Sequence, residues 1–415
     1  MKEIKVVIGK NFGDEGKGKC VDFLCNMAVK EGKWPLVVRH NGGAQAGHTV
    51  EEGDFRFVFH QLGSGSRRGA PVYWSSTYLP DLLKLGEEAE AFLETQKKTE
   101  IQIYANPNCI CTTVYDVLLN SFAESLRSGE NHGSCGMGIY ETVRRTERVK
   151  AGEVGDHYAF CLGDLSGKSP AGFAELLKKI RDGYVPERIN EIAGGQDVSK
   201  DNEWLSLMYD DNLLWNTAEI MWENYNRRIV LTDAAPLFSG FDTIIFENAQ
   251  GLMLDRDNTP YFPHLTPSHT GVWNVCQILK EAGIKLASVD LHFVTRSYVT
   301  RHGKGRLDYE CGRDAINPDM VDLTNVPNRW QGCLRYAKHP AAEDFFGPVE
   351  REAAEFLAYW KREAKGAESS LTVRSFIDVT HLDETGSKLL FCDGSVEIGE
   401  FSDCCKMRGL HMTVL

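Results

Sequence analysis

The most constraining feature of the sequence is a glycine-rich loop between a short apolar strand and a patterned helix. Residues 4–8 form a β-branched apolar run, residues 9–18 are rich in glycine, and apolar side chains then recur at helical spacing as far as Val29. Such a unit presents backbone N–H groups at a helix N-terminus, where they bind phosphate. We therefore expect an α/β fold that binds a nucleotide.

A second strand, at 35–39, also runs into a glycine-rich loop. We expect one domain over residues 1–415: a large, mostly parallel central sheet with surrounding helices and a P-loop-like nucleotide-binding fold. A helical insertion is expected at about 105–230, and a small C-terminal region at about 370–415. Further strands are expected at 55–61, 72–74, 101–104, 242–246, 286–294, 371–379 and 388–392, and helices at 79–94, 203–227 and 271–282. In the 203–227 helix the expected core positions are Trp204, Leu207, Met208, Leu213, Leu214 and Ile220.

The first loop fits the P-loop spacing GxxxxGK over residues 13–19, but Cys20 replaces the serine or threonine that would bind magnesium. A thiol is a poor ligand for Mg²⁺. Glycines let backbone N–H groups approach phosphate, and Lys17 can neutralise it. Asp14 and Glu15 would repel phosphate unless a magnesium ion or a proton transfer requires them. The alternative is a surface turn whose acids support a helix N-terminus.

The second loop, residues 41–49, contains three glycines and His48. A histidine at the end of a strand can donate a hydrogen bond to an oxyanion or a phosphoryl oxygen. An ordinary loop histidine is the alternative at this point.

Charge and composition exclude several classes of partner. Because 46 Lys and Arg face 59 Asp and Glu, the net charge is -13, which disfavours nucleic acid polymers and acidic membranes but not a small phosphorylated metabolite. The N-terminus has no signal-like apolar region, and no apolar run is long enough to span a membrane, so we expect a cytoplasmic protein. The spacing of the twelve cysteines favours reduced, mostly buried thiols over a zinc site.

Six segments in order resemble the adenylosuccinate synthetase family. The first two are the loops GDEGKGK and NGGAQAGHT, which match that family's GDEGKGK and NGGxxAGHT. The others are FENAQG at 246–251 with Leu254-Asp255 after it (family FEGAQG and LLD), FPHLTPS at 262–268 (YPYVTSS), YVTRHGKG at 298–305 (YTTRVGxG) and VTHLD at 379–383 (LTKLD).

The resemblance implies a GTP-dependent ligase that joins IMP to L-aspartate through a 6-phosphoryl intermediate, giving adenylosuccinate, GDP and phosphate. It also implies Mg²⁺ as the cofactor and a homodimer as the working form. Asp14 would be the catalytic base and a magnesium ligand, and His48 the catalytic acid. The main-chain carbonyl of Gly47 would be the second protein ligand of the metal.

The same resemblance implies three sets of binding residues. GTP would be held by Gly13, Gly16, Lys17, Gly18, Gly47 and Thr49 at its phosphates, and by Asp383 at its guanine. The purine nucleotide would be held by Gln45, Cys135, Gln250 and Thr266, with Arg144 or Arg145 reaching the phosphate in the partner subunit. The amino acid would be held by Thr324, Asn325 and Arg329.

Several positions depart from the family pattern. Gln45 replaces an asparagine, Cys135 a threonine, Asn248 a glycine, Pro327 the first arginine of the amino-acid loop, and His381 a lysine beside the guanine. The residues assigned to phosphoryl transfer are retained, so one hypothesis is a relative with altered purine and amine pockets.

Two alternatives therefore stay open beside the reaction of IMP with aspartate. One is a paralogue acting on another purine nucleotide (a deoxynucleotide, GMP or dGMP) or on another amine. Retention of Asp14 argues against a related group that makes a 2-amino product from dGMP and lacks this aspartate. The other is a GTP-binding regulator without synthesis, favoured by the GxxxxGK spacing and a TxxD guanine signature.

Overall fold

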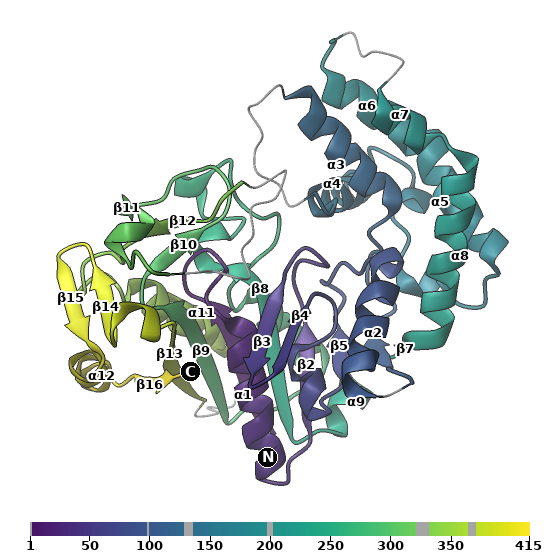
Figure 1. Ribbon diagram of the computed structural model, residues 1–415. Helices are drawn as coiled ribbons and strands as arrows, with labels where there is room; N and C mark the ends of the chain where they lie inside the picture. Colours follow the sequence, from purple (N-terminus) through teal and green to yellow (C-terminus); the bar gives the residue numbers. More distant parts are fainter. Residues whose placement is uncertain (1, 98, 128–135, 197–201, 321–331, 364–370) are drawn as a thin grey trace.

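The structure is a computed structural model that describes residues 2–97, 99–127, 136–196, 202–320, 332–363 and 371–415 (Figure 1). The strands are β1 (Glu3–Gly9), β2 (Pro35–Arg39), β3 (His48–Glu52), β4 (Phe55–Phe59), β5 (Val72–Trp74), β6 (Ile103–Ala105), β7 (Ile229–Leu231), β8 (Thr243–Gly251), β9 (Ser288–Arg296), β10 (Val299–Arg301), β11 (Glu310–Cys311), β12 (Arg335–Ala337), β13 (Thr372–Thr380), β14 (Lys388–Phe391), β15 (Gly394–Glu397) and β16 (His411–Val414). The α-helices are α1 (Lys17–Lys30), α2 (Leu82–Gln96), α3 (Val114–Leu126), α4 (Ile139–Lys150), α5 (Pro170–Lys179), α6 (Val185–Ala193), α7 (Glu203–Met208), α8 (Asp211–Arg228), α9 (Ala234–Ser239), α10 (Trp273–Glu281), α11 (Gly347–Glu363) and α12 (Ile398–Met407).

A nine-stranded sheet organises the fold, in the order β16-β13-β9-β1-β8-β2-β5-β6-β7. Every pair of neighbours in it is parallel, which confirms the expected α/β class. β1 lies between β9 and β8. The chain passes from β1 to strands on one side of it and later crosses to β9 on the other side, so the order of strands changes direction at β1. In open parallel sheets ligands bind outside the carboxyl end of such a switch point. The glycine-rich loop after β1 lies at that end.

Both faces of the sheet are covered, because parallel sheets bury both sides. Ile4, Val6 and Ile8 of β1 point to a large core formed with α10 and α11. Val7 points to the opposite face, where it packs with α1. The alternation along β1 therefore fixes α1 on one side of the sheet and the later helices on the other.

The described chain between β6 and β7 contains the helices α3 to α8, which share an apolar core with α2 and β5. In Figure 1 its helices α3 to α8 stand above and to the right of the sheet. The single helix expected at 203–227 is wrong, because it is two helices. Asp210 lies between the two helices. It caps the N-terminus of α8 by accepting a hydrogen bond from the Asn212 N–H at 2.8 Å.

This break changes which side chains reach the core. Met208 and Leu214 are buried as expected, and Trp204 and Leu213 are partly buried. Leu207 and Ile220 are 40% and 42% exposed, so their assignment to the core is wrong. The expected apolar periodicity runs through this break as if the helix were continuous. It therefore assigns some side chains to the buried face although they lie on the exposed face.

Two expected strands lie outside the large sheet. The run at 55–61 forms β4, which pairs antiparallel with β3 so that His48 lies opposite Phe59. The run at 388–392 forms β14, which pairs antiparallel with β15. Alternating apolar residues predict a strand but not the strand with which it pairs. Here a short turn places each of these strands beside the strand that is adjacent in sequence.

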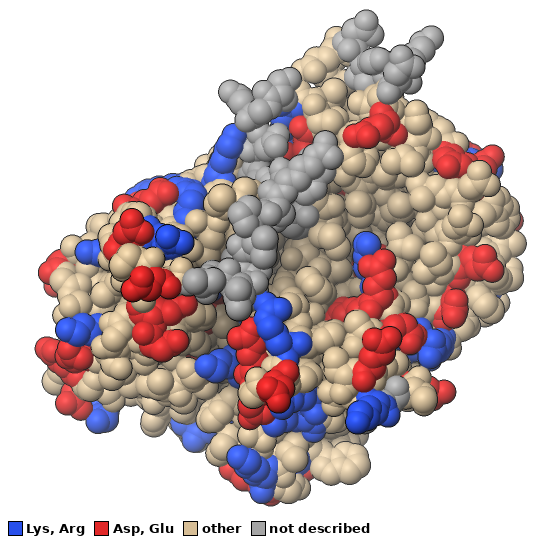
Figure 2. Space-filling view, in the orientation of Figure 1, with Lys and Arg blue, Asp and Glu red and all other residues tan. Residues whose placement is uncertain are grey.

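The described helices include none long and apolar enough to cross a bilayer. On the face shown in Figure 2, acidic and basic side chains are interspersed.

Glu88 of α2 forms hydrogen bonds with the main chain that follows β4. Its carboxylate accepts hydrogen bonds from the N–H groups of His60 (2.8 Å), Gln61 (2.8 Å) and Leu62 (3.0 Å), and the side chain is buried. An unsatisfied buried donor costs about 1–3 kcal/mol. We therefore expect Glu88→Ala to lower the free energy of unfolding by about 3 kcal/mol or more in urea denaturation.

The neighbouring Glu87 provides the control for this prediction. Its side chain is 75% exposed and pairs with Lys84 at 3.3 Å. Glu87→Ala should change the unfolding free energy by less than about 0.5 kcal/mol, as for other exposed pairs. Equal effects of the two substitutions would show that the Glu88 hydrogen bonds do not stabilise the fold.

Candidate active site

The loop after β1 is built around the side chain of Glu15. Its Oε1 accepts hydrogen bonds from the N–H groups of Asn11 and Gly13, each at 2.9 Å. Burial raises the pKa of Glu15, and the ammonium of Lys17, 3.7 Å from Oε2, opposes that shift. Glu15 therefore joins two backbone N–H groups within the loop instead of facing a ligand. This role explains how a carboxylate can be present in a loop that is expected to bind phosphate.

Lys17 is the lysine of this loop. It is 2% exposed, and its Nζ donates to the Gly13 carbonyl at 2.5 Å. Lys19, the lysine of the GxxxxGK spacing, is exposed on the outer side of α1. Of the two lysines, Lys17 is therefore the one held inside the loop, as expected for the lysine that would neutralise phosphate.

The N-terminus of α1 faces the loop without a side-chain cap. Gly16 is the N-cap residue and has a left-handed backbone (φ 87°), and no acidic residue lies in the first turn. Uncapped N–H groups at a helix start, together with the helix dipole, favour an anion. The arrangement suits the phosphates that the sequence assigned to Gly13, Gly16, Lys17 and Gly18.

Close backbone contacts bring the predicted loops together. A β-carbon on Gly18 would lie 2.9 Å from the carbonyl oxygen of Thr49 and 3.0 Å from the carbonyl carbon of His48. One on Gly13 would lie 3.0 Å from the Cα atom of Gln250. Only glycine permits these approaches, so the first loop touches both the His48 loop and the end of β8.

His48 opens β3 and belongs to a buried polar cluster. Its Nδ1 is 2.6 Å from Oε1 of Glu247, and the Ser64 hydroxyl and N–H also donate to that carboxylate. Nη1 of Arg39 lies 3.8 Å from Oε2 of Glu247. Each of these four side chains is buried.

The electrostatics of this cluster define the state of His48. Burial lowers the pKa of His48 to about 4, despite the opposing effect of Glu247, so the imidazole is neutral near pH 7. Burial opposes ionisation of Glu247, but His48, Arg39 and Ser64 outweigh it and hold its pKa below the usual range. Nδ1–H then donates to Glu247, and Nε2 has no hydrogen-bond partner in the described residues. Nε2 is the atom left to meet a ligand.

Sequence reasoning missed Glu247, although it lies in the FENAQG segment. The signal was present, because an acidic residue inside an apolar parallel strand is seldom buried without a partner. Ser64 and Arg39 come from separate segments and carried no such signal.

Asp14 sits at the open side of the loop. Its side chain is 27% exposed, its main-chain oxygen accepts from Nε of Arg296 at 2.5 Å, and its Oδ2 is 3.8 Å from Nε2 of His302. His302 stands where the resembled motif has valine, and sequence reasoning missed it. The Asp14 carboxylate and the exposed main chain of Gly47 are hard oxygen donors, so these two residues fit Mg²⁺.

Of the residues expected to bind the purine, Gln250 is the last but one of β8 and has a left-handed backbone (φ 64°), a conformation that costs energy for a residue other than glycine. Thr266 is partly buried, and its N–H donates to the Leu254 carbonyl at 2.9 Å. Gln45 folds onto its own loop, since its Oε1 accepts from the Gly43 N–H at 2.6 Å.

Of the two arginines expected to reach the partner subunit, Arg145 instead forms hydrogen bonds within its own chain. It is fully buried, and its guanidinium donates to both carboxylate oxygens of Asp116 (3.0 and 2.7 Å) and to the Cys111 carbonyl. Arg144 is only partly buried. The structure therefore leaves Arg144 as the candidate.

Asn248, where the resembled motif has glycine, is explained by packing. It is fully buried, its Oδ1 is 2.6 Å from Nε2 of His40, and its amide donates to the Thr270 carbonyl at 2.6 Å. These bonds link β2, β8 and the segment before α10. These packing contacts explain the asparagine at this position without an altered substrate pocket.

The end of β13 joins the other side of the loop. The Thr380 hydroxyl donates to the Glu15 carbonyl at 2.9 Å, and His381 has a left-handed backbone (φ 57°). Asp383 follows, exposed, in a short 3-10 helix (Asp383–Thr385). Cys135, Thr324, Asn325, Pro327 and Arg329 lie outside the described residues.

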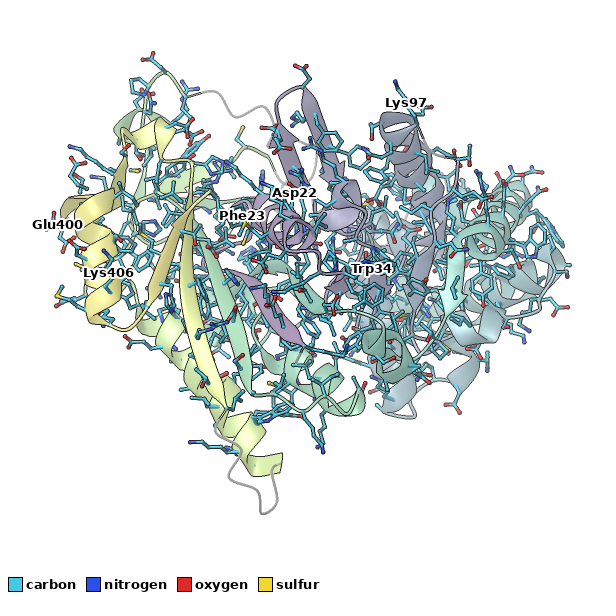
Figure 3. The ribbon with its side chains drawn as sticks, turned by 90° about the horizontal axis from the view of Figure 1, so that it is seen from below. Asp22, Phe23, Trp34, Lys97, Glu400 and Lys406 are labelled. Carbon is cyan, nitrogen blue, oxygen red and sulfur yellow. The ribbon has the colours of Figure 1, made fainter. Side chains whose placement is uncertain are left out.

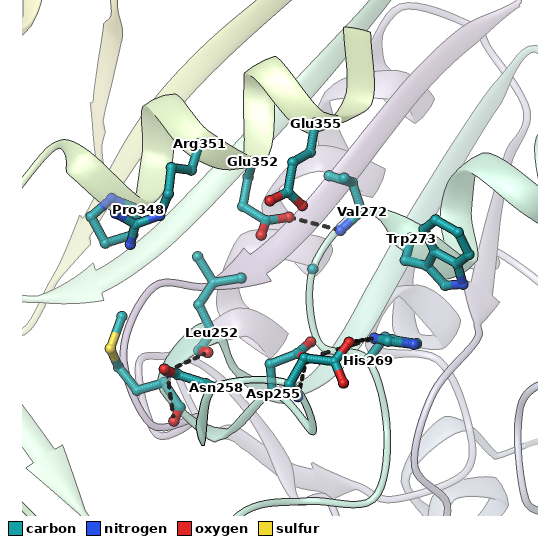
Figure 4. Close-up of a pocket in the computed structure, with 13 residues that line it drawn as sticks. Leu252, Asp255, Asn258, His269, Val272, Trp273, Pro348, Arg351, Glu352 and Glu355 are labelled. Carbon is teal, nitrogen blue, oxygen red and sulfur yellow. Dashed lines mark hydrogen bonds and ion pairs between the residues drawn. The ribbon is translucent and has the colours of Figure 1, made fainter. Parts of the chain in front are cut away.

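A separate pocket of about 320 Å³ opens after β8 (Figure 4). Figure 4 shows Asp255 beside His269, and Glu352 accepting from the Val272 N–H at 2.9 Å. Burial raises the pKa of Glu352 to about 7. None of the predicted site residues lines this pocket, so we distinguish it from the candidate active site.

Known proteins match this chain over most of its length. The family model for adenylosuccinate synthetase matches residues 6–320. The adenylosuccinate synthetase of Picrophilus torridus is 29% identical over 355 residues, 81% of this chain and 74% of that protein. That of Thermoplasma acidophilum is 29% identical over 316 residues, 74% of this chain and 64% of that protein.

Two solved structures share the fold. The fully ligated adenylosuccinate synthetase from Plasmodium falciparum superposes with a TM-score of 0.61 at 21% identity, covering 94% of this chain and 80% of that one. The succinoaminodeoxyadenylate synthetase (PurZ) of cyanophage S-2L gives 0.57 at 14% identity, covering 100% and 92%. The family match over residues 6–320 identifies the chain as an enzyme of the ligase class: it belongs to the adenylosuccinate synthetase family.

Proposed function

We propose that the chain uses GTP to join IMP and L-aspartate, forming adenylosuccinate, GDP and phosphate. The observation that supports this most strongly is that the loop carrying Asp14 packs against the backbone of His48, whose ring is paired with the buried Glu247. The contact of Gly18 with the His48–Thr49 backbone holds their loops together. A phosphate-binding loop alone would serve any nucleotide protein, but a base and a buried histidine beside it suit phosphoryl transfer to an oxygen.

The proposed reaction has two steps. Asp14 accepts the N1 proton of IMP, and the resulting O6 anion attacks the γ-phosphorus of GTP, releasing GDP. The aspartate amine then attacks C6 and displaces phosphate. His48 is neutral without ligands, and the phosphates of bound GTP would favour protonation of its Nε2, because nearby negative charge raises the pKa of a histidine. The imidazolium would then donate to the transferred phosphoryl oxygens, and Glu247 would stabilise its charge. Mg²⁺, held by Asp14 and Gly47, would neutralise charge on the GTP phosphates.

Lys17 provides a test of the GTP site. Its buried ammonium lies beside the Gly13 carbonyl and the start of α1. A hydrogen bond to a charged group is worth about 1.5–3 kcal/mol, so we expect Lys17→Met to raise the Kd for GTP by about 10- to 100-fold. Binding of IMP should change little. Isothermal titration calorimetry with each nucleotide measures both.

Lys19→Met is the matched control, because Lys19 is exposed two residues further along α1. It should leave both affinities nearly unchanged. If the two substitutions had the same effect, or if Lys17→Met weakened IMP as much as GTP, the assignment of the loop would be wrong.

We propose a homodimer in the cytoplasm as the working form, with Arg144 reaching the IMP phosphate of the partner. Its partial exposure beside the buried Arg145 supports this choice. Sedimentation velocity in the presence of IMP and GTP should therefore show a species of twice the 46.5 kDa chain mass. A 46.5 kDa species alone would contradict the dimer.

A second candidate changes the substrates and keeps the chemistry. The cyanophage neighbour was solved with dGMP and with dATP as an energy donor. His381, in place of a lysine beside the guanine, favours relaxed donor selection here, whereas Asp14 favours a purine that must lose its N1 proton. A regulator without synthesis is disfavoured, since nucleotide binding alone gives no reason for the His48–Glu247 pair.

A panel reaction distinguishes these candidates. The enzyme with Mg²⁺ is given IMP, dIMP, GMP or dGMP, each with L-aspartate and with GTP, ATP or dATP, and products are followed by mass spectrometry and phosphate release. An adduct of IMP and aspartate with GTP supports the proposal. An adduct only with another purine or donor supports the second candidate, and nucleotide binding without any adduct supports the regulator.

A further inference from the structure

Three side chains of the kinds that bind transition metals meet between α1 and the sheet. They are Cys20 on α1, His292 on β9 and Asp378 on β13, which are 0%, 4% and 1% exposed. Oδ2 of Asp378 is 2.8 Å from Nδ1 of His292 and 3.7 Å from Sγ of Cys20, and one ligand atom of each residue lies within 4.8 Å of the other two. In Figure 3 Asp22 and Phe23 mark the part of α1 just beyond Cys20.

The charges of the ligands would balance a divalent cation. Lys5, whose charge acts on Cys20, pairs with Asp290 at 3.1 Å. Ligation would release the proton of Cys20, because the thiolate is the form that binds a metal. A divalent ion bound to one thiolate and one carboxylate would form a neutral buried unit, which avoids the cost of an unbalanced buried charge.

The histidine of the cluster is held in a fixed orientation. Its ring stacks on Phe376, with centroids 4.5 Å apart and planes 15° apart, so the ring has little freedom. Nδ1 is the ring nitrogen that faces Asp378, at 2.8 Å from its Oδ2. A neutral imidazole ligates metals through either nitrogen, so Nδ1 is placed to bind an ion together with Asp378 and Cys20.

We propose that Cys20, His292 and Asp378 form a binding site for a divalent transition-metal ion, best matched by Zn²⁺. The ion accepts sulfur, nitrogen and oxygen ligands at about 2.0–2.3 Å in a tetrahedral arrangement, which requires only a small widening of the His292–Asp378 contact. The site differs in kind from the oxygen donors Asp14 and Gly47, because a thiolate disfavours Mg²⁺. A bound ion would tie α1 to β9 and β13 below the phosphate loop.

The test uses Co²⁺ as a visible substitute for Zn²⁺ in the full chain. Cys333 and Cys392 are exposed and are first replaced by serine, so that surface thiols do not compete. We expect one equivalent of Co²⁺ to give a thiolate-to-cobalt charge-transfer absorption that Zn²⁺ abolishes. Loss of a residue that merely supports a ligand already weakens metal binding about 10- to 100-fold. Cys20→Ala should therefore weaken Co²⁺ binding by more than about 100-fold.

Cys25→Ala is the matched control, since Cys25 is a second buried thiol on α1 outside the cluster. It should keep the absorption, whereas His292→Gln should shift and weaken it. Absorption that survives Cys20→Ala, or none in the parent chain, would overturn the proposal. The readout is metal binding and not synthesis, so its outcome is independent of the substrates proposed above. Thermal unfolding of each variant checks that it folds.

Discussion

Asp14→Asn should abolish most of the synthesis while leaving nucleotide binding largely intact. A positioned general base contributes about 10²- to 10⁴-fold to a rate, and we expect kcat to fall within this range. Asparagine keeps the shape of the side chain, and the main-chain oxygen stays bonded to Arg296. The measurement is the rate of adduct formation at saturating substrates, together with the Kd values of GTP and IMP.

The adjacent Glu15 is the control for this prediction. Its Oε1 acts as an acceptor for two loop N–H groups, and glutamine retains such an oxygen. Glu15→Gln should therefore cost far less activity than Asp14→Asn, although the two carboxylates are neighbours in sequence. Unchanged synthesis by Asp14→Asn would rule out the proposed proton transfer.

Glu247→Gln should lower kcat by about 10²-fold or more, the size of the loss when one preorganised charge-stabilising group is removed. Glutamine fills the same space between His48, Ser64 and Arg39 but removes the buried negative charge. The imidazolium that His48 would form beside the bound phosphates then loses the carboxylate that stabilises it. Steady-state kinetics should show the loss in kcat more than in the KM for IMP.

A double-mutant cycle separates catalysis from folding. If Glu247 acts through His48, then His48→Asn and the double variant should have similar rates, because residues that act as a unit are not additive. Glu51→Gln, an exposed change on the same strand as His48, should behave as the parent. Additive losses, or full activity of Glu247→Gln, would contradict the pairing.

Much of the sheet could be predicted because several of its strands are apolar runs, and β1 and β2 end at glycine-rich loops. β2 and β5 have the predicted bounds, and β1, β9 and β13 differ from theirs by one or two residues at the ends, whereas β8 runs on to Gly251. The helical stretch was harder to predict. Asp210 interrupts it by capping α8, and a polar residue within a helical pattern does not show whether it caps a new helix or lies on the solvent side.

The two loops of the candidate site could be predicted because each carries its chemistry in a few consecutive residues. Their side-chain partners could not be predicted, since these come from distant segments. Glu247 lies 199 residues from His48, and Asn248 lies 208 from His40. Read alone, Asn248 suggested an altered pocket, whereas its partner makes it a packing residue.

The central place of β1 has a consequence for the synthesis of the chain. β1 pairs with β8 from Glu3↔Thr243 onward and with β9 from Lys5↔Asp290 onward, so β1 leaves the ribosome before either of its neighbours. At the usual rate of translation, roughly 10 to 50 seconds pass before β8 follows. During this interval Val6, Val7 and Ile8 have no sheet to join, while β2, β5 and β6 can already pair with one another. The nascent protein therefore exposes the apolar residues of β1 until β8 is made, and its yield in cells should depend on chaperones that shield this strand.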